Sequence, residues 1–235
     1  VSDLYYCEYT GDYLPEAFYG RFSANSVAEL QPQIDKTLQY EQFLMPDPSF
    51  LNEAVLAAGA DNSHQERWGN GQVNYGTTTF FNAAHNLVAH TYLQPEPAGG
   101  NYSQKIQANI SRGVAYANYS AHGSREGWSS PMFSISDITK LSNTDKYGLI
   151  VANCCLTSCF NLNSFGEELV RAEHKGALAY IGASDLTYWD EDYYWSVGYG
   201  SVVTNPTYET TGLGALDRMF HDHNEPRSEW CSTTG

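Results

Sequence analysis

The sequence of 235 residues predicts an α/β protein in which a mostly parallel β-sheet is flanked by helices on both faces. Short apolar segments alternate with helical patterns about every 30 residues, which is typical of β-α-β units. The apolar segments lack the polar alternation of half-exposed strands, so both faces of each strand are expected to be buried. The whole chain, 1–235, is expected to form one unit, because no linker or internal repeat divides it.

The individual elements follow from apolar runs, capping residues and glycines. The segment YGLIVAN at 147–153 is the most continuous apolar run. Ser26 and Glu29 have capping-box spacing before a helix with one apolar face, in which Pro32 fits poorly. In chain order, we expect a strand and a helix start in 17–26, a strand in 52–61, an amphipathic helix over 77–93, a strand at 113–119, a short helix over 134–143, a strand at 147–153, a helix over 165–176 and a strand at 177–184.

Composition and charge exclude two classes of function. The chain has 27 acidic and 12 basic residues, and a net charge of −15 argues against a nucleic-acid partner. It has no apolar stretch near the ~18 residues of a transmembrane helix, so no transmembrane segment is expected. The first residues, VSDLYYCEYT, carry no recognisable targeting signal, and the chain is expected to be a piece of a longer protein.

Reactive side chains follow several predicted strands. Asp61, His122, Cys154 and Cys155 and the loop after Ser184 all come where a predicted strand ends. Because the carboxyl ends of parallel strands meet at one edge of a sheet, we expect these groups to lie together.

These residues have the chemistry of a cysteine nucleophile and its partners. His122 is a candidate base, Asp61 a candidate orienting carboxylate, and the amides of Gly123 and of the cysteine itself are candidate oxyanion donors. Residue types alone do not choose between Cys154 and Cys155, and a single buried cysteine is more often a small apolar side chain.

Two weaker patterns suggest metals. His221, His223 and Glu225 stand close together in FHDHNE and are candidate zinc ligands, although such a segment is more often a solvated helix end. Asp12 and Glu16 flank turn residues that could offer carbonyl oxygens to calcium, although an ordinary acidic turn has the same composition.

Four segments closely resemble the gingipain family of caspase-like cysteine peptidases, and within it the lysine-specific members: ANYSAHGS…W, NCCLT, FGEELVRAEHKGALAYIGAS and YWDEDYYWSVG. The resemblance runs along nearly the whole chain and weakens near its end. It implies a caspase-like (caspase-hemoglobinase) fold. It also implies that residues 1–235 form the larger catalytic subdomain, without the N-terminal subdomain and the C-terminal end of the family's catalytic domain.

The resemblance assigns the catalytic roles residue by residue. Cys155 matches the nucleophile, His122 the general acid/base and Asp61 the acid that orients the histidine. Gly123 and the Cys155 amide match the oxyanion donors, while Cys154 would be a neighbour packed away from the substrate. The loop after Cys155 departs from the family pattern, because it is shorter by about two residues and carries Cys159.

The same resemblance implies a pocket for the lysine side chain. Asp192 would face the substrate ammonium, Trp189 would form an apolar wall, and Tyr188, Asn153 and Ser120 would lie near the pocket. Structural calcium sites are also implied, with no organic cofactor. Their ligands would be Asp12, the Leu14 carbonyl and Glu16 in one site, and the Phe160 carbonyl and Glu167 in another, with Thr10 replacing an acidic ligand of the family.

The function implied is a secreted endopeptidase, extracellular or on a bacterial outer membrane, that hydrolyses protein or peptide substrates after lysine through an acyl-enzyme on Cys155. Two alternatives remain. One is an arginine-preferring peptidase of the same family, since a carboxylate accepts either cation. The other is a catalytically silent, calcium-stabilised adhesion or inhibitory module that keeps the fold.

Overall fold

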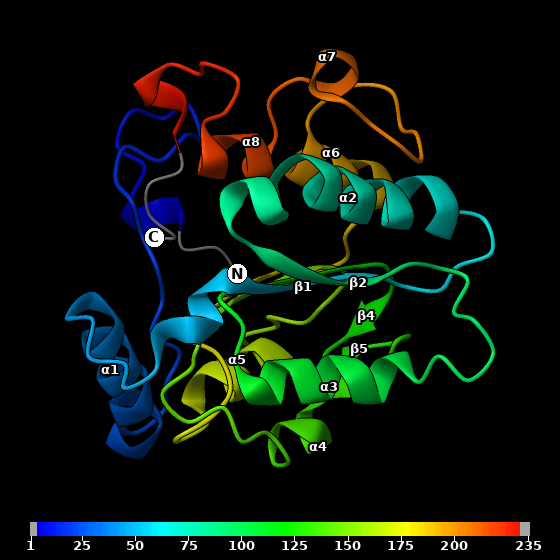
Figure 1. Ribbon diagram of the computed structural model, residues 1–235. Coiled ribbons are helices and arrows are strands. Elements are labelled where there is room, and N and C mark those ends of the chain that lie inside the picture. Colours follow the sequence, from blue (N-terminus) through cyan, green and yellow to red (C-terminus); the bar gives the residue numbers. More distant parts are fainter. Residues whose placement is uncertain (1–3, 231–235) are drawn as a thin grey trace.

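A five-stranded, fully parallel sheet forms the centre of the computed structural model, which describes residues 4–230 (Figure 1). The strand order is β2-β1-β3-β7-β8, which confirms the predicted parallel α/β architecture. The strands are β1 (Glu53–Ala58), β2 (Val88–Tyr92), β3 (Tyr116–Ser120), β7 (Leu149–Asn153) and β8 (Ala179–Gly182). A small antiparallel sheet lies beside them, with strands β4 (Gly123–Ser124), β5 (Gly127–Trp128) and β6 (Phe133–Ser134).

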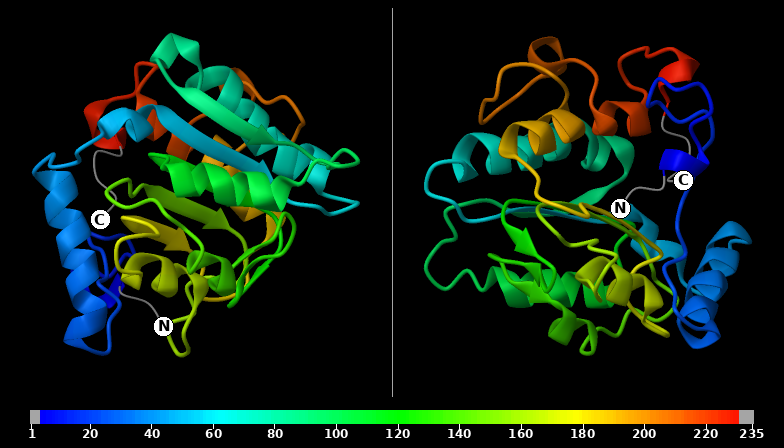
Figure 2. Two further views of the ribbon diagram at one scale, coloured as in Figure 1. Left: turned by 60° about the horizontal axis from the view of Figure 1, so that its bottom comes forward. Right: turned by 180° about the vertical axis from the view of Figure 1, so that it is seen from behind.

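Helices cover both faces of the central sheet (Figures 1 and 2). One face carries α2 (Asn70–Tyr75), α6 (Trp189–Val197), α7 (Tyr208–Thr211) and α8 (Ala215–Phe220), and the other carries α3 (Tyr102–Arg112), α4 (Ile135–Ile138) and α5 (Phe165–Arg171). The helix α1 (Val27–Glu41) packs against α5 at the side of the molecule. Shorter turns of 3-10 helix span Leu4–Tyr6, Pro48–Asn52, Ala83–His85 and Arg227–Glu229, and π-helical turns span Gln65–Gly69 and Gly76–Phe80.

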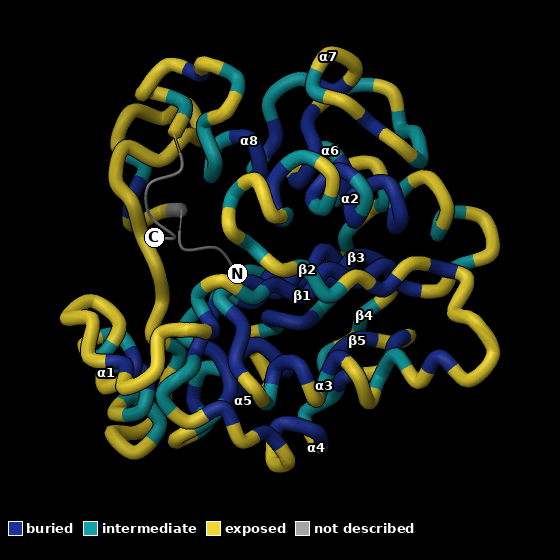
Figure 3. Tube along the Cα trace, viewed as in Figure 1, coloured by how far each residue is buried: buried dark blue, intermediate teal, exposed yellow. Residues whose placement is uncertain are grey.

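Successive strand residues contribute to two separate cores. In β1, Val55 and Ala57 face one core, while Ala54 and Leu56 face the other. All four are buried, and Figure 3 shows the central strands as the most buried part of the chain. Burial on both faces explains why these strands show no polar alternation in the sequence.

The strand register aligns the carboxyl ends that matter for the site. Ala58 pairs with Ser120, and Ser120 pairs with Asn153. The chain segments that leave β1, β3 and β7 therefore start level with one another at one edge of the sheet.

The helix predicted over 77–93 is wrong. The helical turn Gly76–Phe80 is not continued beyond Phe80. The Asn82 side chain accepts a hydrogen bond from the Ala84 amide, and Asn86 has a left-handed φ of 56°. The chain then enters the edge strand β2. The asparagines favour these turns because their short polar side chains bond to nearby backbone and tolerate left-handed geometry.

Other predicted boundaries also differ. Residues 17–22 lie in no strand, and nearly all of them are exposed. The helix expected over 134–143 is confined to α4, and the one expected over 165–176 ends at Arg171. No helix described over residues 4–230 is long and apolar enough to cross a membrane.

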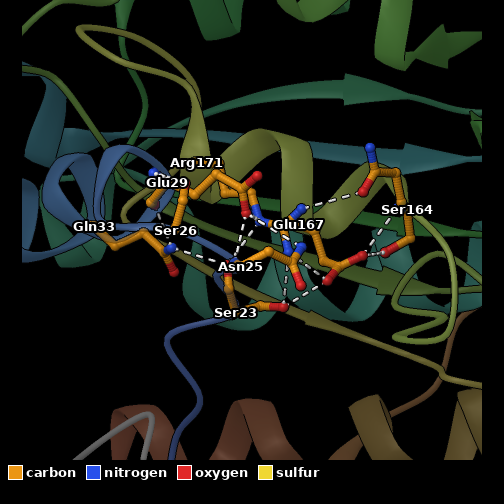
Figure 4. Close-up of polar contacts among 9 residues, drawn as sticks. Ser23, Asn25, Ser26, Glu29, Gln33, Ser164, Glu167 and Arg171 are labelled. Carbon is orange, nitrogen blue, oxygen red and sulfur yellow. Dashed lines mark hydrogen bonds and ion pairs between the residues drawn. The ribbon is translucent and has the colours of Figure 1, made fainter.

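The segment before α1 is fastened to α5 by one buried arginine (Figure 4). Arg171 donates to the Ser23 carbonyl at 2.7 Å and to Glu167 Oε1 at 2.8 Å, and the Ser23 hydroxyl donates to the same Glu167 oxygen at 2.5 Å. Glu167 Oε2 accepts from the Ser164 amide and hydroxyl, which caps α5. This network ties the exposed segment before α1 to the buried side chains of α5.

Candidate active site

The catalytic candidates His122 and Asp61 meet at the carboxyl edge of the sheet. His122 Nε2 lies 2.8 Å from Asp61 Oδ2, although the two residues are 61 positions apart. β1 ends three residues before Asp61 and β3 two residues before His122, so the aligned strand ends bring the side chains together. Because Asp61 engages Nε2, Nδ1 is the nitrogen available to exchange a proton with a nucleophile.

Asp61 is held by its own loop as well as by His122. Its Oδ1 accepts hydrogen bonds from the amides of Ser63 and His64, at 2.8 and 2.9 Å, and lies 2.9 Å from His64 Nδ1. Partial burial tends to raise the pKa of Asp61, but these bonds and the bond from His122 together hold it well below its usual range. Asp61 is therefore a fixed carboxylate that holds His122 through Nε2.

His64 is a site residue that the sequence analysis missed. It lies three residues after Asp61, and an aspartate followed by a tight turn often bonds to backbone two or three residues later. That spacing was the only available signal, and it does not indicate the ring contact.

The loop after His122 lies directly against the cysteine pair. A Cβ added at Gly123 would lie 2.5 Å from Cys154 Sγ and 3.0 Å from the Cys155 carbonyl oxygen. Only glycine allows this approach without displacing the cysteine segment. The structure thus brings Gly123 and both cysteines together, as expected from their strand ends.

The two cysteines have different environments. Cys154 has no exposed surface, and burial raises the pKa of its thiol far above the usual range. Cys155 is partly exposed, and its Sγ lies 3.5 Å from the Thr187 amide and 3.7 Å from the Thr187 carbonyl oxygen. A nucleophile needs both access and an attainable thiolate, so the environment favours Cys155.

Thr187 connects Cys155 to the predicted specificity residue. Its hydroxyl donates to Asp192 Oδ2 at 2.9 Å and lies 3.9 Å from Cys155 Sγ. Burial raises the pKa of Asp192 to about 6, partly offset by the bond from Thr187. Thr187 precedes α6 in an irregular segment, and nothing in the sequence pattern indicated it.

Aromatic rings border the carboxylates. The Trp189 ring stacks on His64, with centroids 5.0 Å apart and planes 6° from parallel, and meets His122 edge to face at 5.4 Å. Trp68 donates from its indole nitrogen to Asp190 at 2.7 Å, which fixes the start of α6 against the Gln65–Gly69 turn. Tyr188 is exposed at the N-cap of α6.

Ser120 and Asn153 lie in a buried polar network below the site. Gln72 donates to Ser120 Oγ at 2.6 Å and accepts from Asn153 at 3.1 Å and from Ser196 at 2.8 Å. Asn153 also donates to Ser196 at 2.7 Å. These bonds join β3 and β7 to α2 and α6, so Ser120 and Asn153 support the frame of the site. Sequence analysis missed Gln72 and Ser196, since their partners are distant in the chain.

Two of the three predicted N-terminal calcium ligands, Asp12 and Glu16, lie close together. Carboxylate oxygens of Glu8, Asp12 and Glu16 lie within 4.8 Å of one another, and the Leu14 amide donates to Asp12 Oδ1. Oxygen-only donors on a turn match calcium chemistry. Glu8 was not among the expected ligands, while the hydroxyl of Thr10 donates to Glu16 Oε1 at 2.9 Å.

The second predicted calcium set does not fit a cation. Glu167 has both carboxylate oxygens engaged by Ser23, Ser164 and the guanidinium of Arg171. The guanidinium of Arg21 stacks over the ring of Phe160, 4.9 Å from its centroid. An ion beside Glu167 would have to displace a buried arginine of like charge.

Comparisons with known proteins give consistent matches. Residues 1–231 match the sequence profile of peptidase family C25. The chain is 43% identical over 224 residues to Lys-gingipain W83 of Porphyromonas gingivalis, covering 94% of this chain but 13% of that protein. It is 28% identical over 181 residues to gingipain R2 of the same species, covering 74% of this chain and 24% of that protein. A solved structure described as "Structure of Protease" superposes with a TM-score of 0.86 at 43% identity, covering 94% of this chain and 48% of the other.

Proposed function

The chain belongs to peptidase family C25, and we propose that it carries the active site of a cysteine endopeptidase that cleaves after lysine. The observation that carries this proposal is the pair formed by Asp61 and His122, whose neighbour Gly123 lies against the segment of the partly exposed Cys155. The half-buried carboxylate of Asp192 is linked to Cys155 through Thr187. The caspase-like fold of the family agrees with the parallel sheet described above.

In the proposed reaction, Cys155 Sγ attacks the carbonyl carbon of the scissile bond and His122 Nδ1 takes the thiol proton. The C–N bond then breaks as His122 returns that proton to the leaving amine. Water, activated by His122, hydrolyses the resulting thioester. Asp61 holds Nε2 and stabilises the imidazolium, as a carboxylate does behind other catalytic histidines. The amides of Gly123 and Cys155 are the proposed donors to the oxyanion.

Lysine preference is proposed from Asp192 and the rings beside it. The half-buried carboxylate of Asp192 can pair with an ammonium group, and an aliphatic stem can pack against an indole face such as that of Trp189. The higher identity to Lys-gingipain than to gingipain R2 supports the same preference.

The test is covalent labelling of the protein with a lysyl chloromethyl ketone, followed by mapping of the adduct by mass spectrometry. We expect a single adduct on Cys155, and we expect the arginyl analogue to label Cys155 much more slowly. Equal labelling by both reagents would favour the arginine-accepting alternative. No adduct on folded protein would favour the silent module, and an adduct on Cys154 or Cys159 would overturn the assignment of the nucleophile.

Calcium binding at Glu8, Asp12 and Glu16 is also proposed, as a structural site only. Calcium is expected to raise the melting temperature of the protein, and Glu16→Gln is expected to remove that effect, while Glu167→Gln leaves it. Loss of the effect in Glu167→Gln alone would place the ion at the second set. Secretion or display at a cell surface, and the role of 1–235 as the larger catalytic subdomain, stay predictions.

A further inference from the structure

A second cluster of metal-binding side chains lies far along the chain from the catalytic candidates, at the end of α8. Asp217 belongs to α8, and His223 and Glu225 belong to the loop that follows it. Ligand atoms of the three residues lie within 4.8 Å of one another. His223 Nδ1 is 3.2 Å from Asp217 Oδ1 and 3.5 Å from Glu225 Oε1.

The cluster is buried and its polar atoms are incompletely satisfied. The side chain of Asp217 has no exposed surface and that of Glu225 is 1% exposed. His223 Nδ1 and Glu225 Oε1 are buried, and neither makes a hydrogen bond within the described residues, although they face each other. Two buried carboxylates this close together repel each other and are poorly solvated. A bound dication would relieve both the repulsion between the carboxylates and their poor solvation.

The spacing of the ligand atoms is compatible with a zinc site. Zinc bonds to imidazole nitrogen and carboxylate oxygen at about 2.0–2.2 Å, which places neighbouring ligands of a tetrahedral site roughly 3.3–3.6 Å apart. The separations of 3.2 and 3.5 Å lie just below and within this range. We propose that Asp217, His223 and Glu225 bind a divalent cation of the zinc type.

Surrounding contacts orient all three ligands. Tyr75 donates its hydroxyl to Asp217 Oδ1 at 2.6 Å, and the Gly214 amide donates to Oδ2 at 2.9 Å. The His223 ring stacks on Tyr208 with centroids 3.8 Å apart, and its amide donates to Glu225 Oε2 at 3.0 Å. Such supporting bonds are usual around metal ligands. The ion would fasten the loop after α8 to α8 itself and, through Tyr75, to α2, so its role is structural.

The test uses the full chain as Cys155→Ala, because zinc also binds catalytic thiolates. After chelation and dialysis, zinc is titrated by calorimetry and by thermal unfolding. We expect one equivalent to bind and the melting temperature to rise by several degrees, since the ion binds the folded state selectively. His223→Gln is expected to abolish both effects, and the matched control His221→Gln, on the same loop but outside the cluster, is expected to keep them.

Asp217→Asn gives a second, independent variant, in which a zinc-dependent rise in melting temperature is expected to vanish whatever the starting stability. Cobalt substitution separates this site from the remaining cysteines, because thiolate ligation adds charge-transfer absorption that an imidazole-carboxylate site lacks. Zinc binding that survives in His223→Gln, cobalt spectra with thiolate bands, or a response to calcium alone would each overturn the proposal. No zinc binding to the folded parent protein would overturn it as well.

Discussion

His64 Nδ1 lies 2.9 Å from Oδ1 of Asp61, the same carboxylate whose other oxygen lies 2.8 Å from His122. Asp61 therefore holds two imidazoles at once. Only His122 follows a strand that borders the cysteine segment, whereas His64 stacks on Trp189. His64 thus links the orienting carboxylate to the proposed wall of the lysine pocket, and its hydrogen bond and its ring surface should have separable effects.

Two substitutions of His64 are expected to separate these effects. His64→Phe keeps a ring against Trp189 but loses the bond to Asp61, so kcat should fall about fivefold to tenfold with KM nearly unchanged. His64→Gln keeps a donor but loses the stacked ring, so KM for lysyl peptides should rise instead. Steady-state kinetics on both variants measures the two effects. The same changes in kcat and KM in both variants would show that His64 only maintains the fold.

Cys155→Ala is expected to abolish turnover, and Cys154→Ala to keep most of it. The buried Cys154 thiol, with its strongly raised pKa, is a poor nucleophile, whereas Cys155 is accessible. Peptidase activity per folded molecule, counted by circular dichroism and active-site labelling, measures this. Equal loss in both variants would mean that the nucleophile is assigned to the wrong sulfur.

Asp192→Asn is expected to raise the barrier for lysyl substrates by about 2–4 kcal/mol, the scale of a lost buried charge partner. Burial raises the pKa of Asp192 to about 6, so its charge, and with it kcat/KM for lysyl peptides, should increase as pH rises through about 6. That limb of the pH profile should disappear in Asp192→Asn. A profile with the same midpoint in the variant would assign the limb to another group.

Gly123→Ala is expected to reduce kcat by more than about a hundredfold, because the new methyl group would contact Cys154 Sγ at 2.5 Å. Adding Cys154→Ala removes the nearest obstructing atom and should restore part of the activity, leaving contacts of 3.0 Å with the Cβ of residue 154 and with the Cys155 carbonyl oxygen. If the double variant were no better than Gly123→Ala, the contact with Cys154 Sγ would not be the cause of the loss.

Arg171→Met is expected to lower the free energy of unfolding by about 3 kcal/mol, because it leaves the buried Glu167 carboxylate without its cation. Arg125→Met, which breaks the ion pair of Arg125 with Glu126, whose side chains are 41% and 61% exposed, is the control and should cost about 0.5 kcal/mol or less. Urea unfolding of both variants gives the comparison. Similar costs would mean that Glu167 finds solvent or another partner when Arg171 is lost.

The predictions from sequence worked best where burial alone determined structure. The strands β1, β3, β7 and β8 were all located, and with them the edge that gathers Asp61, His122 and the cysteines. They failed where local side-chain chemistry overrode periodicity. Asn82 and Asn86 end the helix expected over 77–93 and make room for β2, which the apolar pattern did not distinguish from a helix.

Contacts between distant segments were beyond single-sequence reasoning. Gln72 is an ordinary polar residue in the sequence, yet it joins Ser120, Asn153 and Ser196 inside the fold. His64 had a weak turn signal and Thr187 had none. Their roles come from geometry that only the assembled sheet and helices create.

The position of Thr187 has a consequence for redesign of the proposed peptidase site. One residue touches the sulfur of Cys155 through its backbone and the carboxylate of Asp192 through its side chain. Exchanging Asp192 alone to accept a new side chain would therefore disturb the neighbour that positions the nucleophile. Transplanting the whole segment 185–192 from a relative with the desired preference would preserve that coupling, and so should yield a more active altered enzyme than any single exchange in the pocket.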